Sequence, residues 1–202
     1  MNADQIKNKF GAYYIADDLT FKMGIDVRFA DQLARRFNNL NVLETCTGGG
    51  FSTLSLARYA RHVYTVEIDK SRVQDAKKNA KIAGIEKKIT FINGDVLAID
   101  LKKTIPTIDA AFLDPDWADT GENHSYKFIN SNTEPPSDIL LQAILSITPN
   151  ITLVQPPFIN PEEFDQLPAH ECELLYLGKI HELYCLHFGK IAKLTGKSEY
   201  KV

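Results

Sequence analysis

The chain has 202 residues, of which 44% are hydrophobic and 24% are charged, and its formal net charge is -3. These proportions are typical of a folded domain and exclude a chain that is disordered by composition. No apolar run reaches the roughly 18 residues of a membrane span, and no secretory signal opens the sequence. We therefore expect a cytoplasmic protein with no membrane partner.

Charge and cysteine content narrow the function classes further. The slightly acidic balance gives no support to binding of duplex DNA through many phosphates. The three cysteines, Cys46, Cys172 and Cys185, have no CxxC spacing, which argues against a disulfide framework and a zinc ribbon. The five histidines show no ligand-like clustering, so we predict no metal site.

Helices and strands alternate along the predicted chain. Apolar residues recur every four positions from Ile25 to Phe37, which predicts an opening helix. A short strand at Asn41–Glu44, a glycine turn and a helix beginning near Phe51 follow. The later strands are expected at 62–68, 89–93, 108–114 and 151–155, and the later helices at 70–83 and 137–147. Two apolar runs within 172–189 predict a terminal hairpin.

This order of elements predicts a doubly wound α/β fold. Its sheet should be mostly parallel, with seven strands and an antiparallel C-terminal hairpin. We expect a helical segment at 1–37, the main domain at 38–190 and a basic tail at 191–202. The lysines of that tail could contact phosphates, but such a run is more often a solvated chain end.

The turn from Glu44 to Gly50 is the first candidate binding feature. It leaves a strand at the edge of the sheet where ligands of parallel sheets bind. Its three consecutive glycines allow a tight bend and a close approach of a ligand to the backbone. A glycine triplet also fits a turn without a ligand or a dinucleotide site. The spacing matches neither GxGxxG nor a phosphate-binding loop, which argues against a pyrophosphate cofactor.

Acidic residues stand near the ends of three successive predicted strands. Glu44 enters the turn, Glu67 ends the second strand, and Asp95 follows the third. A carboxylate at the second position can accept both hydroxyls of a ribose, and Asp95 can accept from an adenine amino group. Each acid alone is more often a helix cap or a loop residue. Together they suit a ligand that has an ammonium group and a ribose.

These residues resemble the first motifs of the class I S-adenosylmethionine-dependent methyltransferases, over roughly residues 38–155. The resemblance implies a Rossmann-like methyltransferase fold, S-adenosylmethionine as cofactor and S-adenosylhomocysteine as product. The implied cofactor-binding residues are Glu44, Thr45, Cys46, Gly48, Gly50, Phe51, Thr53, Glu67, Ile68, Asp95, Val96 and Asp114. Cys46 is expected to pack rather than to act as a nucleophile, because no histidine is near it in the sequence.

The sequence Asp114-Pro115-Asp116-Trp117 follows the fourth predicted strand. It resembles the (Asp/Asn)-Pro-Pro-(Tyr/Phe/Trp) motif of methyltransferases that modify exocyclic amines of bases. In such a motif the acid and the carbonyl of the following proline accept the two N–H bonds of the amine. We therefore predict Asp114, Pro115 and Trp117 as catalytic residues, with Trp117 stacking on a planar base. Asp116 stands where the motif has its second proline.

The flanking segments FKMGIDVRFADQLARRF and ITPNITLVQPPFINPEEFDQL resemble the trimethylguanosine synthase family. This resemblance covers roughly residues 20–190 and implies methyl transfer to the guanine N2 of capped RNA, with Trp117 stacking on the guanine. A guanine amine elsewhere in RNA, or in a nucleotide, is an equally open acceptor. The alternatives are a small-molecule methyltransferase and a noncatalytic cofactor-binding subunit. In the small-molecule alternative Asp116, Asn123, His124 and Tyr126 would shape the pocket.

Overall fold

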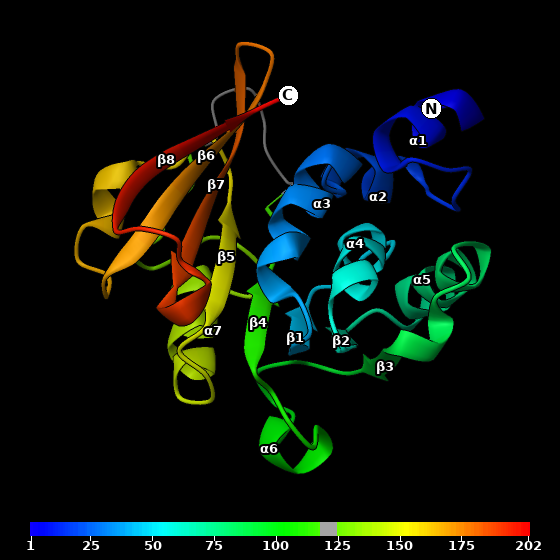
Figure 1. Cartoon of the computed structure of the whole chain (residues 1–202), viewed down its shortest axis with the longest axis horizontal. Coiled ribbons are helices and arrows are strands. Elements are labelled where there is room, and N and C mark those ends of the chain that lie inside the picture. Colours follow the sequence, from blue (N-terminus) through cyan, green and yellow to red (C-terminus); the bar gives the residue numbers. More distant parts are fainter. Residues whose placement is uncertain (118–124) are drawn as a thin grey trace. The chain divides into compact units, whose positions relative to one another are not determined.

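The computed structural model describes residues 1–117 and 125–202, which divide into two compact units, Met1–Asp109 and Ala110–Val202 (Figure 1). The sequence did not predict this division. The domain boundaries expected at 37/38 and 190/191 stay predictions. Asn123 and His124, considered above for a small-molecule pocket, lie outside the described residues.

The first unit contains three parallel strands in the order β3-β2-β1. They are β1 (Asn41–Thr45), β2 (His62–Glu67) and β3 (Ile89–Asn93). Thr45 is paired with Val66, and Glu67 with Asn93, so the carboxyl ends of the strands lie at one edge. The helices that follow the opening segment are α3 (Val27–Ala34), α4 (Phe51–Tyr59), α5 (Lys70–Ile82) and α6 (Leu101–Thr104), with 3-10 turns at Arg35–Phe37 and Glu86–Lys88. Three of the predicted cofactor residues, Glu44, Thr45 and Glu67, lie at the carboxyl ends of β1 and β2.

Within the expected helical segment 1–37, the sequence located only the helix at 25–37, and two further short helices precede it. Helix α1 (Ala3–Phe10) and helix α2 (Asp18–Met23) each begin with a capping box, at Asn2 and Asp17. In a capping box a side chain accepts an otherwise unpaired N–H group of the first turn. The ring of Phe10 is stacked on the ring of Phe51, with a centroid separation of 3.5 Å and an interplanar angle of 4°. The N-terminal segment therefore packs beside the start of α4.

The second unit contains five strands in the order β4-β5-β7-β6-β8. They are β4 (Ala110–Leu113), β5 (Ile151–Gln155), β6 (His170–Leu177), β7 (Ile180–Phe188) and β8 (Gly196–Lys201). Strand β4 is parallel to β5, while β7 is antiparallel to both β5 and β6. Helix α7 (Ser137–Leu145) precedes β5, and 3-10 turns lie at Pro161–Phe164 and Gly189–Ile191. The predicted α/β class with a C-terminal hairpin is confirmed.

The predicted number of seven strands is wrong, because the structure has eight strands among the described residues. Strand β8 lies within the segment expected to be a solvated basic tail and pairs in parallel with β6. Its sequence GKSEYK has no apolar alternation, which is the signal that identifies a strand in a sequence. A hydrogen bond of 2.7 Å from the Ser198 hydroxyl to Glu171 Oε1 helps to hold it.

A buried polar network crosses three strands of the second unit. The His187 side chain is fully buried; its Nδ1 lies 2.8 Å from Thr152 Oγ1 and its Nε2 lies 3.0 Å from Glu173 Oε2. Buried polar groups are tolerated when they are hydrogen-bonded, so this network fixes the pairing of β5, β6 and β7.

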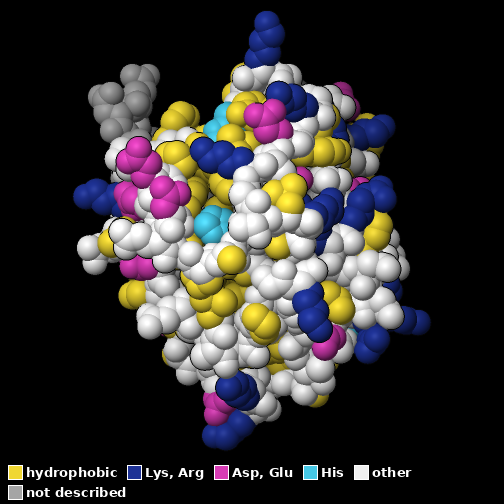
Figure 2. Space-filling view, turned by 60° about the vertical axis from the view of Figure 1, so that its left-hand side comes forward, with side chains coloured by type: hydrophobic (Ala, Val, Ile, Leu, Met, Phe, Trp, Pro, Cys, Tyr) yellow, Lys and Arg dark blue, Asp and Glu magenta, His cyan; other side chains and the backbone are white. Residues whose placement is uncertain are grey.

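Charged side chains of one sign do not form a continuous patch on the face shown in Figure 2. Figure 2 shows Lys and Arg side chains spread over one face, with Asp, Glu and hydrophobic side chains between them. No helix in the described part of the chain has the length and apolarity needed to cross a membrane.

Candidate active site

The glycine turn after β1 contains several left-handed backbone conformations. Cys46, Gly48 and Gly50 have φ angles of 61°, 52° and 81°. A Cβ atom at Gly50 would lie 2.9 Å from the Cβ of Ala76 on α5, whereas one at Gly48 would meet no atom of the described residues within 4 Å. Gly50 is therefore required for close packing on α5. Gly48 leaves open space beside the backbone, as expected where a ligand approaches it.

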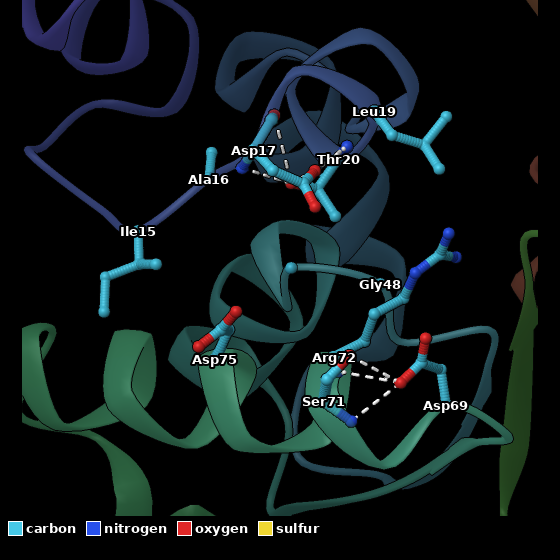
Figure 3. Close-up of a pocket in the computed structure, with 11 residues that line it drawn as sticks. Ile15, Ala16, Asp17, Leu19, Thr20, Gly48, Asp69, Ser71, Arg72 and Asp75 are labelled. Atoms are coloured by element: carbon cyan, nitrogen blue, oxygen red, sulfur yellow. Dashed lines mark hydrogen bonds between the residues drawn. The ribbon is translucent and has the colours of Figure 1, made fainter.

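A cavity of about 210 Å³ adjoins this turn in the first unit (Figure 3). Its wall is formed by the segment before and within α2, by the glycine turn and by the first turns of α5. The lining residues are Ile15, Ala16, Asp17, Leu19, Thr20, Gly48, Gly49, Asp69, Ser71, Arg72 and Asp75. Hydrogen bonds with Thr20 lower the pKa of Asp17, and hydrogen bonds with Ser71 lower the pKa of Asp69. The Arg72 side chain extends from α5 toward α2, and its charge makes a smaller contribution to both decreases.

The Glu67 carboxylate is bound to the backbone on both sides of it. Its Oε2 accepts the Gly48 N–H at 2.9 Å, and its Oε1 accepts the Asp69 N–H at 2.9 Å. The side chain is only 4% exposed. Each carboxylate oxygen has a second lone-pair site that remains available to a further donor. Glu67 thus holds the glycine turn in place, and its contact with a ribose stays a prediction.

The end of β3 is joined to the end of β2 by Asn93. Its Nδ2 donates to the carbonyl oxygens of Glu67 and Ile68, at 2.9 Å in each case. The Ile68 side chain beyond them is 71% exposed. Asp95 is exposed, and its Oδ1 accepts the Leu97 N–H at 2.9 Å, while Val96 is buried. The structure therefore brings Glu67, Ile68 and Asp95 to one edge of this sheet.

The Glu44 carboxyl group is buried beneath the glycine turn. It is 1% exposed, and its Oε2 accepts a hydrogen bond of 2.5 Å from the Thr53 hydroxyl. Burial raises its pKa to about 7, against hydrogen bonds from Thr53 and Thr65 that lower it, and the Glu67 charge adds to the increase. A carboxyl group in this state is stabilised in its charged form by any nearby cation.

The raised pKa of Glu44 predicts a specific pH dependence of stability. Between pH 4.5 and about 7 the folded chain retains a proton that the unfolded chain loses, so the free energy of unfolding falls as the pH rises through this window. The loss approaches about 3 kcal/mol and persists above pH 7. Denaturant unfolding at pH 5 and pH 8 should show a smaller loss for Glu44→Gln than for the wild type. Glu86→Gln, at an exposed site, is the matched control. Equal losses in wild type and Glu44→Gln would contradict this assignment.

The other predicted cofactor residues occupy several environments. Thr53 is fully buried and bonded to Glu44, and Phe51 is buried against Phe10. Thr45 is fully buried, and its hydroxyl has no hydrogen-bond partner among the described residues. Cys46 is half-buried and donates its backbone N–H to Val66 at 2.9 Å. Direct cofactor contact by these side chains stays a prediction.

The acceptor motif follows β4 in the second unit. Asp114 and Trp117 are half-buried, and Pro115 is buried. Trp117 meets the buried ring of Tyr126 edge to face, with a centroid separation of 6.0 Å and an interplanar angle of 82°. An indole ring held in this way keeps a defined orientation. The roles predicted for Asp114, Pro115 and Trp117 stay predictions.

Asp116 forms a backbone bridge that a proline could not form. Its N–H donates to the Glu134 carbonyl at 2.8 Å, and the Glu134 N–H donates back to Asp116 at 2.9 Å. Proline lacks the N–H donor, so the family motif could make only one of these bonds. The Glu134–Pro135 peptide bond next to the bridge is cis. The substitution therefore gives this motif a fixed connection to the loop before α7.

Two asparagines that support the first-unit site were not predicted. Asn93 joins two strand ends, and Asn79 on α5 donates to the Gly49 carbonyl at 2.9 Å. Only the position of Asn93 directly before Gly94-Asp95 gave a signal in the sequence. Asn79 stands in a polar helix without any pattern that distinguishes it from its neighbours.

Residues 40–175 match the model of the protein family described as RNA cap guanine-N2 methyltransferase. Among curated proteins, an uncharacterized RNA methyltransferase of Halalkalibacterium halodurans is 28% identical over 163 residues, covering 73% of this chain and 32% of the relative. A release factor glutamine methyltransferase of Bacillus cereus is 34% identical over 91 residues, covering 43% of this chain and 31% of the relative. The chain spans about a third of the length of these relatives.

Solved structures agree with this fold. A structure from Porphyromonas gingivalis W83 that has a provisional methyltransferase name covers 95% of this chain and 48% of its own, with a TM-score of 0.72 and 16% identity. An RNA methyltransferase from Salinibacter ruber in complex with S-adenosylhomocysteine covers 81% of this chain and 92% of its own, with a TM-score of 0.53 and 14% identity. At these identities the likeness concerns the fold alone. Because the family model spans most of the chain, this protein belongs to the RNA cap guanine-N2 methyltransferase family.

Proposed function

We propose that this protein binds S-adenosylmethionine at the glycine turn of its first unit and transfers the methyl group to an exocyclic amine. The buried Glu44 carboxyl supports this proposal, because its raised pKa makes a neighbouring cation such as an ammonium group favourable. The open space beside Gly48 allows a ligand to approach the backbone there. The residues present therefore fit the cofactor.

In this proposal three residues bind different parts of the cofactor. Glu67 accepts ribose hydroxyls with the lone pairs left after its two backbone hydrogen bonds. Ile68 offers an exposed apolar side chain to the adenine ring, and Asp95 offers a carboxylate to the adenine amino group. The bound cofactor supplies a methyl group activated by a sulfonium.

The observation that carries the acceptor assignment is the motif Asp114-Pro115-Asp116-Trp117, placed directly after β4 in a chain of this family. Asp114 accepts one N–H of the amine and the Pro115 carbonyl accepts the other, which orients the nitrogen lone pair. Trp117 stacks on the planar acceptor, with its orientation set by Tyr126. Orientation of this kind lowers the barrier without a covalent enzyme intermediate.

Guanine N2, in RNA or in a nucleotide, is the acceptor that we propose first. The family description names this atom, and a relative is named as an RNA methyltransferase. The second candidate is the side-chain amide of glutamine in a protein, because another relative is named as a release factor glutamine methyltransferase. Both acceptors present a planar group with two N–H bonds to the same pair of oxygens. A cytoplasmic location stays part of the proposal.

Transfer of a labelled methyl group tests this function. The purified chain is incubated with labelled S-adenosylmethionine and, separately, with cap analogues, total RNA, guanine nucleotides and a release-factor protein. We expect label in a guanine-containing acceptor, at N2 when the product is digested and identified. Label only on glutamine would select the second candidate. Tight cofactor binding without transfer to any of these would favour a noncatalytic subunit.

A further inference from the structure

The segment 15–20, here called the N-terminal strap, forms one wall of the cavity next to the glycine turn. Ile15, Ala16, Asp17, Leu19 and Thr20 of the strap all line that cavity, together with Gly48 and Gly49 (Figure 3). Asp17 caps α2 through its contacts with Thr20. The strap precedes the part of the chain matched by the family model, which begins at residue 40.

Asn79 joins the strap to the glycine turn. This side chain on α5 is fully buried. Its Oδ1 accepts the Ile15 N–H at 2.7 Å, and its Nδ2 donates to the Ile15 carbonyl and to the Gly49 carbonyl, at 2.9 Å in each case. One acceptor oxygen and both amide hydrogens are thus used. Aspartate at this position would lose both donors, and alanine would lose all three bonds.

A second contact joins the N-terminal segment to the end of the same turn. Phe51, the first residue of α4, is stacked on Phe10 of α1. The Phe51 ring also lies so close to Gly24 and Gly49 that a Cβ atom at either position would lie 2.6 Å from it. Two contacts therefore connect the glycine turn and the start of α4 to residues before Ile25.

We propose that Asn79 is a positioning residue for the cofactor, because it couples the order of the N-terminal strap to the conformation of the glycine turn. The proposal rests on the function proposed above. Gly49 is the neighbour of Gly48, whose N–H is bound to Glu67, so a change at the Gly49 carbonyl is transmitted to the backbone that meets the cofactor. Coupling between two sites is reciprocal, so the bound cofactor must also stabilise the strap.

Cofactor affinity and amide hydrogen exchange together test this inference. S-adenosylhomocysteine is titrated into the full chain as wild type, Asn79→Ala, Asn79→Asp and Lys81→Ala. Lys81 is an exposed residue of the same helix and serves as the matched control. We expect both Asn79 variants to bind at least about tenfold more weakly than the wild type, and Lys81→Ala to bind as the wild type does. Exchange is measured at residues 15–20 with and without the ligand.

The exchange data separate a positioning role from a general loss of stability. In the wild type, the ligand should slow exchange in the strap; in Asn79→Ala, strap exchange should be fast without ligand while α5 stays protected. Unchanged ligand affinity in a folded Asn79 variant would overturn the proposal. The proposal would also be overturned if the ligand did not slow exchange in the strap of the wild type. This second test needs no variant. Failure of the wild type to bind the ligand would instead contradict the proposed function, and the ligand-free exchange would still test the Asn79 link.

Discussion

Replacing Asp114 with alanine should lower the rate of methyl transfer at least about a hundredfold, because in the proposed site the acceptor amine would lose one of the two oxygens that orient it. Asp114 is half-buried and directly follows β4, so it lies at the carboxyl end of a strand. The remaining Pro115 carbonyl fixes only one N–H bond. The amine can then rotate away from the alignment that transfer requires.

Three measurements make the Asp114 prediction specific. Single-turnover assays give the transfer rate, titration calorimetry gives the cofactor affinity, and denaturant unfolding gives the stability. The rate of Asp114→Ala should fall by a much larger factor than its cofactor affinity. Asp165→Ala removes an exposed carboxylate from the same unit and should leave the rate unchanged. A wild-type rate for Asp114→Ala would refute the acceptor role of the motif.

Much of the fold follows from local sequence patterns. The strands at 89–93 and 151–155 begin and end at the predicted residues, because short runs of β-branched residues end at polar or proline residues there. Strand β8 could not be found in this way. It is an edge strand, and the hydrogen bonds that place it come from β6, more than 20 residues earlier in the chain.

In the candidate site, too, features set by neighbouring residues were predictable, and contacts between distant residues were not. The glycine turn and the position of Glu67 at a strand end were predicted, because runs of glycine and of strand-forming residues can be recognised from neighbouring residues in the sequence. The bond between the Asp116 N–H and Glu134 depends on a loop that no pattern in the sequence places. Asn79 contacts residues 64 and 30 positions away, and these contacts became visible only in the structure.

Replacing Glu67 with alanine should weaken cofactor binding at least about a hundredfold. The variant loses the oxygens that accept the Gly48 and Asp69 N–H groups, and hydrogen bonds to a charged group contribute about 1.5 to 3 kcal/mol each. If the turn loses about 3 kcal/mol of hydrogen-bond energy in this way, the cofactor affinity falls roughly a hundredfold. Direct contact of Glu67 with the ribose would increase the loss further. Titration calorimetry with S-adenosylhomocysteine gives the affinity.

Glu67→Gln tests how much of the loss of affinity comes from the two backbone hydrogen bonds of Glu67. Glutamine keeps one acceptor oxygen of nearly the same shape, so one backbone bond survives and the expected loss is closer to tenfold. Glu86→Ala removes an exposed carboxylate from the same unit and should bind the ligand as the wild type does. If Glu67→Ala kept wild-type affinity while its free energy of unfolding fell, the carboxylate would serve only to stabilise the turn. Because Gly48 lies on the open side of that turn, we expect the loss of affinity to exceed what the loss of stability alone produces.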